Sequence, residues 1–476
     1  MNKNICIHGH FYQPPREDAW TGVIEEQKSA APFHDWNERI TAECYRPNTE
    51  SPIHGENNNP IKTVNNYEWI SFNIGPTLFS WLEQNDPATY QKIIKADHNS
   101  LAHFKGYGSA IAQAYNHIIM PLANDRDKQT QVIWGIKDFE YRFRRKPLGM
   151  WLPETAVDLK TLEVLAENHI LFTILAPKQA KSIKLINDQN WTSVNESTLN
   201  TKVAYLCRLP SGKTIHLFFY DGFISSELAF GKIIQSGVEI ANHMLGKFDH
   251  KNTAELVHVA TDGETYGHHR QFGNMALSYL IEHIQKNNLA KITNYALFLK
   301  EHKTEYEVEI HENTAWSSSV GVERWCAAGG GCINYKKSWT QKWRAPLREA
   351  MDWLRDELIP LYEKGMKGKG DPWVKRDHFI DDILHKRKRP PLLEMQHMAM
   401  LMYTSCGWFF DDISGIETVQ ILQYAARAME IAKEECGVNL EQKFLKILSR
   451  ARSNYRRKGT GEDIYVNEVK KRALHV

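Results

Sequence analysis

Short apolar runs, each ending in polar or aromatic residues, recur along the first 300 residues of this 476-residue chain. Runs of about four to eight apolar residues, rich in β-branched and aromatic side chains, are typical of buried strands. Helical patterns lie between most of these runs, at 77–83, 137–145 and 157–168, and in a segment ending at Tyr115. This alternation predicts an α/β barrel of parallel strands, with seven strands at 4–8, 69–73, 101–104, 148–152, 170–175, 214–220 and 256–260.

The pattern changes after residue 300. Residues 312–344 are rich in Ser, Gly and Trp, and apolar residues then recur at the three- and four-residue spacing of helices, at 345–362, 391–405, 415–436 and 440–455. We therefore predict a barrel domain over 1–300 and a helical C-terminal domain over 301–476. The Trp- and Gly-rich segment 312–344 interrupts two regular regions, as binding loops do, and we expect it to close over the barrel mouth.

The stretch 256–269, which reads LVHVATDGETYGHH, gathers the densest set of reactive side chains. Its apolar run ends at Asp262, and Glu264 and His268 follow within a few residues. In sheets and barrels of parallel strands, the chemistry lies at the carboxyl ends of the strands. An Asp-Gly pair alone would indicate a polar turn that caps a core strand. The two carboxylates and the imidazoles together favour an active site.

The first predicted strand also ends in functional groups, because it runs into His8, His10 and then Gln13. Residues i and i+2 of an extended chain face the same side, so the two imidazoles lie together. They are suited either to bind a metal ion or to form hydrogen bonds with a polar substrate.

The strand predicted at 148–152 carries Trp151 and is followed by Glu154. Glu154 and Asp262 therefore each follow a strand of the same predicted barrel. Two carboxyl groups that face each other across a cleft are the machinery of glycoside hydrolysis: one attacks or activates water, and the other protonates the leaving oxygen. From the residues alone, this chemistry is one of several that such a pair supports.

Composition and charge argue against a nucleic-acid-binding protein and against a membrane protein. The net charge of +2 gives no reason to expect nucleic acid or a membrane surface as a partner, and no apolar run approaches the 18 residues of a membrane span. The N-terminal apolar run is too short for a signal peptide. The seven cysteines are widely spread and form no Cys-x-x-Cys pair, so we expect reduced thiols in a cytoplasmic protein.

Three motifs together resemble glycoside hydrolase family 57: His8-Gly9-His10 with Gln13, Trp151-Leu152-Pro153-Glu154, and Asp262-Gly263-Glu264. That family contains α-amylases, 4-α-glucanotransferases, branching enzymes and α-galactosidases. The resemblance implies an incomplete barrel of seven parallel strands followed by a helical domain, which agrees with the pattern described above. It also implies an enzyme that acts on α-linked glucan oligo- or polysaccharides without a metal or another cofactor.

The resemblance assigns roles to these residues. It implies a retaining double displacement with Glu154 as nucleophile and Asp262 as general acid/base. The candidate substrate-binding residues are His8, His10, Gln13, Trp151, Glu264, His268 and Trp325. The sequence departs from the family pattern at 106–110, where a glutamate usually follows a glycine and none is present. The fifth motif is also indistinct, and Trp325 is the candidate for that side of the cleft.

Two other functions remain open at this point. A metal-dependent hydrolase, such as a deacetylase or a mannosidase on a similar barrel, would use His8, His10, Asp262, His268 and His269 as zinc ligands. A degenerate barrel that binds glycan without cleaving it would explain the missing glutamate. The glycosidic linkage, the chain length of the substrate, the balance of hydrolysis and transfer, and the oligomeric state do not follow from the sequence.

Overall fold

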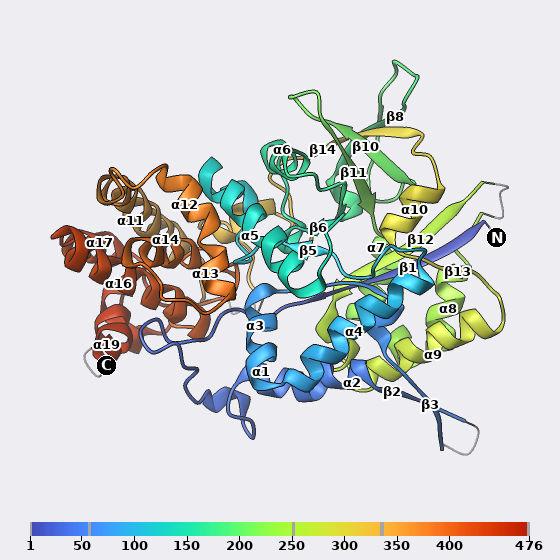
Figure 1. Cartoon of the computed structure of the whole chain (residues 1–476), viewed down its shortest axis with the longest axis horizontal. Helices are drawn as coiled ribbons and strands as arrows, with labels where there is room; N and C mark the ends of the chain where they lie inside the picture. Colours follow the sequence, from blue (N-terminus) through green and yellow to red (C-terminus); the bar gives the residue numbers. More distant parts are fainter. Residues whose placement is uncertain (1, 56–58, 250–252, 334–337, 474–476) are drawn as a thin grey trace. The chain divides into compact units, whose positions relative to one another are not determined.

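The computed structural model describes residues 2–55, 59–249, 253–333 and 338–473, which form two compact units (Figure 1). The first unit consists of Met1–Gln13, Glu26–Gln113 and Phe139–Glu312. The second consists of Pro14–Glu25, Ala114–Asp138 and Asn313–Val476. Each unit therefore gathers segments that are far apart in the sequence, and the boundary between the units crosses a helix, α5 (Asp125–Phe143).

Strand β1 (Lys3–Phe11) is the centre of a four-stranded parallel sheet in the first unit. It pairs with β12 (Glu255–Asp262), β4 (Ser71–Ile74) and β13 (Lys291–Ile292), and Figure 1 shows β1 and β12 side by side. Strands β1 and β12 are buried along almost their whole length, because both are apolar runs. The register of this sheet places residues from three strands at one level.

The remaining strands of the first unit form small sheets. One is a six-stranded mixed sheet in the order β7-β11-β10-β14-β8-β9. A parallel pair joins β5 to β6, and isolated parallel bridges join Phe72 to Ala110 and Gly149 to Phe172. The strands of the described residues are therefore grouped in small and mixed sheets, and the barrel of seven parallel strands stays a prediction. The bounds are β2 (Ser51–His54), β3 (Pro60–Val64), β5 (Ala112–Gln113), β6 (Met150–Trp151), β7 (Phe172–Leu175), β8 (Ala180–Leu185), β9 (Thr192–Ser193), β10 (Ala204–Arg208), β11 (Thr214–Phe219) and β14 (Tyr306–Ile310).

Helices follow many of these strands, and side-chain caps fix several of their starts. Asp158 accepts a hydrogen bond from the Thr161 backbone N–H at the start of α6, and Asp221 accepts one from Ile224 at the start of α7. Such caps satisfy N–H groups that lack a partner inside the helix. The helices of the first unit are α1 (Trp36–Ile40), α2 (Arg46–Thr49), α3 (Pro76–Asn85), α4 (Pro87–His103), α6 (Leu159–Glu167), α7 (Gly222–Ala229), α8 (Gly237–Leu245), α9 (Gly273–Lys286) and α10 (Tyr295–Glu301).

Two of the predicted elements are wrong. The strand predicted at 101–104 is the last turn of α4 and the residue that follows it, because 87–103 continues as one helix. The helix predicted to end at Tyr115 is instead the two-residue strand β5, which is held by its parallel pairing with β6. In both places the tertiary context overrides the local preference of the sequence.

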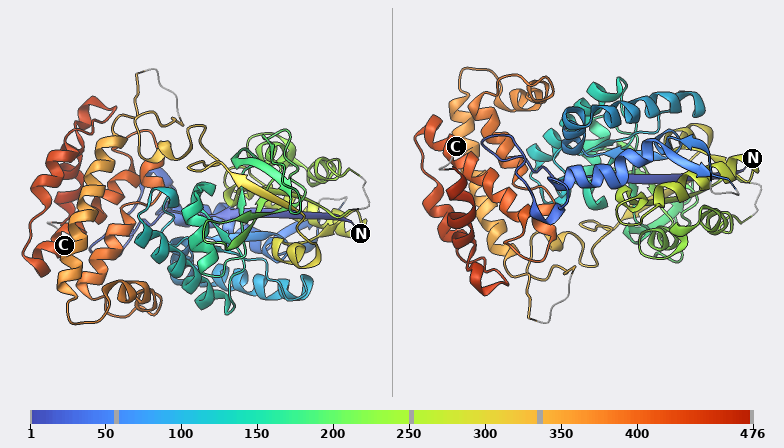
Figure 2. Two further views of the ribbon diagram at one scale, coloured as in Figure 1. Left: turned by 90° about the horizontal axis from the view of Figure 1, so that it is seen from above. Right: turned by 90° about the horizontal axis from the view of Figure 1, so that it is seen from below.

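The second unit is largely helical, as predicted for the C-terminal part of the chain. Helix α14 packs against α16 and α11 against α17, and Figure 2 shows these helices in orange and red. Helix α16 ends at Gly437, whose φ of 70° is the left-handed conformation that glycine adopts without strain. The bounds are α11 (Arg344–Gly365), α12 (Pro372–His378), α13 (Ile380–Leu384), α14 (Pro391–Leu401), α15 (Cys406–Phe409), α16 (Ile416–Cys436), α17 (Glu441–Leu448), α18 (Gly461–Ile464) and α19 (Lys471–Ala473).

Candidate active site

The carboxyl end of β12 presents two acidic residues on either side of a glycine. Asp262 is the last residue of the strand, and Gly263 begins a short 3-10 turn that contains Glu264. A Cβ atom on Gly263 would lie 2.2 Å from the ring of Phe11 in β1, so the two strands approach this closely only because residue 263 has no side chain. The glycine thus lets both carboxyl groups stand at the end of the parallel sheet.

Glu264 is buried, with 5% of its surface exposed, and it is held by two hydrogen bonds. Its Oε1 accepts from the Tyr45 hydroxyl at 2.6 Å and from the Tyr12 backbone N–H at 3.0 Å. Burial raises the pKa of Glu264 to about 7, although both hydrogen bonds favour the charged form and oppose this rise. The carboxyl group therefore titrates near neutral pH.

The Tyr45 side chain comes from a π-helical turn, Thr41–Tyr45, which lies against the loop after β12. The Cys44 thiol donates to the Gly263 carbonyl at 3.4 Å, and the Asn48 side-chain amide donates to the Tyr266 carbonyl at 2.8 Å. Single π turns inside helices are frequent at functional sites. No spacing in the sequence marks this turn, so Tyr45 is a site residue that the sequence did not predict.

Glu154 follows β6 on a strained turn. Its backbone has φ 60° and ψ 17°, and the next residue, Thr155, has a φ of 47°. Left-handed conformations are unfavourable for residues with a Cβ atom and are concentrated at functional sites. The fully buried Gln179 holds this turn, since its Nε2 donates to the Thr155 carbonyl at 2.8 Å and its Oε1 accepts from the Thr155 hydroxyl at 2.9 Å.

The three carboxyl groups of the site influence one another. Although the Asp262 side chain is accessible to solvent, the protein that surrounds its carboxyl group raises its pKa well above the usual range, and the charges on Glu264 and Glu154 act in the same direction. Like charges that share a site cannot all ionise freely, so one carboxyl group keeps its proton while another is ionised. This arrangement can supply a proton donor and a carboxylate nucleophile at the same pH.

His8 and His10 lie beside these carboxyl groups on β1. His10 is level with Asp262 in the register of β1 and β12. Both imidazoles stack on the indole of Trp151, with ring centroids 4.9 Å away in each case. Trp151 is itself fully buried and supports the two histidines from β6. The structure therefore brings His8, His10 and Trp151 into contact, with Asp262 level with His10, and their roles in the site stay predictions.

Gln13 and His268 lie at the edges of the same group. Gln13 is buried, and its side-chain amide donates to the Tyr12 carbonyl at 2.9 Å, next to the backbone N–H that contacts Glu264. His268 forms a short contact through Nδ1 with Glu43 of the π-helical turn. Glu43 is a partner that the sequence did not predict, because more than 200 residues separate it from His268.

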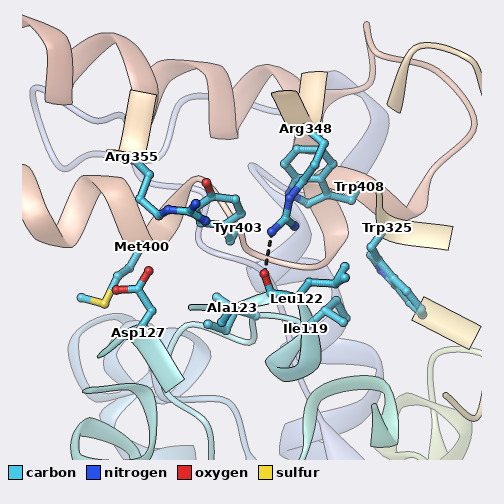
Figure 3. A pocket seen from close by; sticks show the side chains of 11 residues that line it. Ile119, Leu122, Ala123, Asp127, Trp325, Arg348, Arg355, Met400, Tyr403 and Trp408 are labelled. Atoms are coloured by element: carbon cyan, nitrogen blue, oxygen red, sulfur yellow. Dashed lines mark hydrogen bonds between the residues drawn. The ribbon is translucent and has the colours of Figure 1, made fainter. Parts of the chain in front are cut away.

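Trp325 belongs to the second unit and is 1% exposed. It lines a small cavity there with Arg348 and Tyr403, and Figure 3 shows the Arg348 guanidinium donating to the Leu122 carbonyl, at 2.6 Å. The role predicted for Trp325 in substrate binding stays a prediction, and so does the closure of the barrel mouth by 312–344. Within that segment, residues 334–337 lie outside the described residues.

The ligands of the alternative metal site do not form a cluster. In the parts of the chain that the structure describes, no group of three or more His, Cys, Asp or Glu side chains is placed so that it could hold a metal ion. Both ring nitrogens of His8 have partners, Ser71 Oγ at 3.0 Å and Asn73 Oδ1 at 3.1 Å. His269, the fifth predicted ligand, is exposed.

A parallel sheet that ends in polar groups is typical of an α/β enzyme, whose site lies at the carboxyl ends of the strands, and paired carboxyl groups are the groups that glycoside hydrolysis uses. The sequence pattern of glycosyl hydrolase family 57 matches residues 7–311, so the chain belongs to this family. Residues 339–391 and 387–476 match a second pattern, described as a domain of unknown function (DUF3536). No curated protein matches the chain.

Several solved structures share the fold. A maltose-forming amylase from Pyrococcus sp. ST04 superposes with a TM-score of 0.71 at 14% identity, over 94% of this chain and 83% of that one. The family 57 branching enzyme of Thermococcus kodakaraensis gives 0.58 at 13% identity, over 97% and 96% of the two chains. The α-amylase AmyC of Thermotoga maritima gives 0.58 at 12% identity, over 98% and 99%. Among the described residues, no helix is both long and apolar enough to cross a membrane.

Proposed function

We propose that this protein is a retaining glycoside hydrolase or transglycosylase that acts on α-linked glucans, with Glu154 as nucleophile and Asp262 as general acid/base. The observation that carries the proposal is the placement of these two carboxyl groups: Asp262 is the last residue of β12, and Glu154 lies on the turn that follows β6. The choice of α-glucans as substrates is supported by membership of family 57 and by the activities named for its structural neighbours.

The proposal includes an incomplete barrel of seven parallel strands in the order β12, β1, β4, β5, β6, β7 and β11. The parallel pairings and the two isolated parallel bridges support this order. In such a barrel, the residues that follow β6 and β12 face one cleft. For a retaining mechanism, the carboxyl groups of Glu154 and Asp262 should lie about 5–5.5 Å apart in the substrate complex.

The two roles predict different losses of activity. Glu154→Gln removes the nucleophile and should abolish turnover of every substrate. Asp262→Asn should be most harmful when the leaving group is a sugar hydroxyl, which needs a proton, and less so for a nitrophenyl α-glycoside, which does not. With the nitrophenyl substrate, Asp262→Asn should form the glycosyl-enzyme in a burst and then stall, because the same residue must activate water.

Azide tests the assignment directly, since it attacks the anomeric carbon without help from a general base. It should release an azido-sugar of retained configuration from stalled Asp262→Asn, with the Glu154 carboxylate as the leaving group. The exposed Glu167 at the end of α6 provides a matched control, and Glu167→Gln should behave as the wild type. Complete loss of activity in Asp262→Asn on both substrates, with no burst and no rescue, would show that Asp262 is not the acid/base. If the wild type binds maltooligosaccharides and never cleaves them, the alternative that this protein binds glycan without catalysis would be favoured.

A further inference from the structure

A chain of buried amide groups lies behind the histidines of the site. The strand register places Asn73 of β4 level with His10 of β1, and Gln113 of β5 level with Trp151 of β6. Asn73 is fully buried, and Gln113 is 2% exposed. Asn73 is the last residue of the strand predicted at 69–73, and no motif marks either amide as part of a site. Burying an amide costs free energy unless the amide is hydrogen-bonded. The hydrogen-bond partners of Asn73 therefore indicate its role.

The Asn73 side chain uses three of its hydrogen-bonding positions within this group. Its Nδ2 lies 2.7 Å from Gln113 Oε1 and 2.9 Å from His10 Nδ1, and its Oδ1 lies 3.1 Å from His8 Nε2. An amide nitrogen donates and does not accept. In the structure, Gln113 presents its carbonyl oxygen to Asn73, so the end of the Asn73 amide that faces Gln113 is the nitrogen, and the same nitrogen faces His10.

This orientation determines where each imidazole carries its proton. Because Asn73 donates to His10 Nδ1, that nitrogen must be unprotonated, and neutral His10 carries its proton on Nε2. On the other side, the Asn73 carbonyl oxygen accepts from His8, so His8 is also protonated on Nε2. His8 Nδ1 then accepts from the Ser71 hydroxyl at 3.0 Å. Burial, helped by the neighbouring His10, lowers the pKa of His8 to about 3, in agreement with a neutral ring.

We propose that Gln113 and Asn73 are positioning residues that hold His10 as the neutral tautomer with its proton on Nε2. The catalytic part of this inference rests on the proposed function. In that tautomer, the His10 proton lies on Nε2, and the ring adds no positive charge beside Asp262, which is level with His10 in the strand register. A cationic His10 would favour the ionised form of Asp262, whereas the acid of the first step must keep its proton.

The tautomer is measurable without any enzyme assay. Histidine-selective ¹⁵N labelling of the full chain separates the protonated from the unprotonated ring nitrogen, and His10→Gln and His8→Gln identify the two sets of signals. Between pH 6 and pH 8, we expect an N–H at Nε2 and a bare Nδ1 for both residues. A proton on Nδ1 of His10, or a doubly protonated ring, would overturn the proposal, whatever the activity of the enzyme.

Asn73→Asp replaces the donor with an acceptor, so it should move the His10 proton to Nδ1 or leave the ring doubly protonated. If the proposed function holds, the kcat should fall roughly a hundredfold with a smaller change in KM, because a donor at the reacting sugar is lost. Gln113→Glu keeps an acceptor for Asn73 and should retain the wild-type tautomer, whereas Gln113→Leu should not.

A matched control separates positioning from simple loss of stability. Asn66 is also fully buried, and its amide donates to Asn48 at 2.8 Å and to the Asn274 carbonyl at 3.0 Å, so Asn66→Asp disturbs a comparable amide without contacting a histidine. It should destabilise the fold and leave the His10 signals unchanged. If Asn73→Asp does not fold, the spectra of the wild type and Gln113→Glu still decide the tautomer. If the tautomer is as expected and the wild type cleaves no glucan, the proposed function fails and the assignment of the protons remains.

Discussion

Glu264 shows how a single side chain is tuned by its surroundings. The folded protein buries its carboxyl group and raises its pKa to about 7, from an ordinary value of 4.5. Between these two pH values, the folded state keeps a proton that the unfolded state has released. The stabilisation linked to this proton is therefore complete below about pH 4.5 and is lost as the pH rises through 7.

We predict that Glu264→Gln removes this pH dependence, because glutamine does not titrate. From pH 4.5 to pH 8, the free energy of unfolding of the wild type should fall relative to the variant by about 3 kcal/mol, since each pKa unit corresponds to about 1.4 kcal/mol. Urea unfolding followed by tryptophan fluorescence at several pH values measures the difference. The exposed Glu167→Gln should give a curve parallel to the wild type. Parallel curves for Glu264→Gln as well would show that Glu264 titrates normally.

Tyr45 allows a second prediction about the pKa of the Glu264 carboxyl group. Its hydroxyl donates to Glu264 and favours the charged form, so Tyr45→Phe should raise the pKa of Glu264 further. The fall in stability with pH should then occur at higher pH than in the wild type. A titration curve that moves to lower pH would contradict the role of this hydrogen bond.

At the scale of elements, the turn after β6 depends on a side chain from another segment. Gln179 precedes β8, and it satisfies both the hydroxyl and the carbonyl of Thr155 beside the left-handed Glu154. Removing it leaves buried polar groups without partners. This cost adds to the strain that the turn already holds.

We predict that Gln179→Leu lowers the free energy of unfolding by about 1–3 kcal/mol. It should also lower the kcat at temperatures well below the melting transition, since Glu154 loses its orientation. The exposed Gln189 offers a matched control, and Gln189→Leu should change neither quantity. Steady-state kinetics and thermal melting check the prediction together. A Gln179→Leu variant that melts earlier with an unchanged kcat would show that the turn orients Glu154 without Gln179.

The elements that the sequence predicted well are those with strong apolar runs. Strands β1, β4, β7, β11 and β12 were predicted because they are short, mostly apolar runs, and turn or polar residues follow them. The antiparallel partners in the six-stranded sheet were missed. Strand β8, which reads AKSIKL, alternates burial with exposure and contains lysines, so its pattern is weak until its partners are known.

The candidate site, like the fold, was predictable from the sequence only in part. Glu154, Asp262, His8 and His10 follow or end apolar strands, so their places were predictable from local pattern. Their supporting side chains were not. Residues such as Tyr45, Asn73, Gln113 and Gln179 come from segments far away in the sequence, and their importance arises only from contacts that tertiary folding creates.

At the scale of the whole chain, the apolar pattern predicts a change near residue 300 and does not reveal the discontinuous units. The segments Pro14–Glu25 and Ala114–Asp138 join the second unit through specific contacts. The Trp20 indole donates to Glu430 at 2.7 Å, and Arg376 forms an ion pair with Asp127 at 2.8 Å. Contacts over such sequence separations leave no trace in local periodicity. The helical part of the second unit was nevertheless predictable, because amphipathic spacing is a local property.

The last prediction concerns the chemistry of the protein as a whole: activity should survive removal of metal ions. A proton from Asp262 and a nucleophile from Glu154 suffice for the proposed double displacement. Turnover of maltooligosaccharides should therefore be unchanged after dialysis against a strong chelator. The zinc-dependent alternative predicts the loss of activity and its return with added zinc.

A variant of His269 provides a second test of metal dependence, because only the zinc-dependent alternative assigns this residue a role. It is exposed, so His269→Gln should cost little stability. With two catalytic carboxyl groups, this variant should keep the wild-type kcat before and after chelation. A dependence of the kcat on zinc that weakens in His269→Gln would instead identify His269 as a ligand, and the site would then be a metal centre with Asp262 as one of its donors.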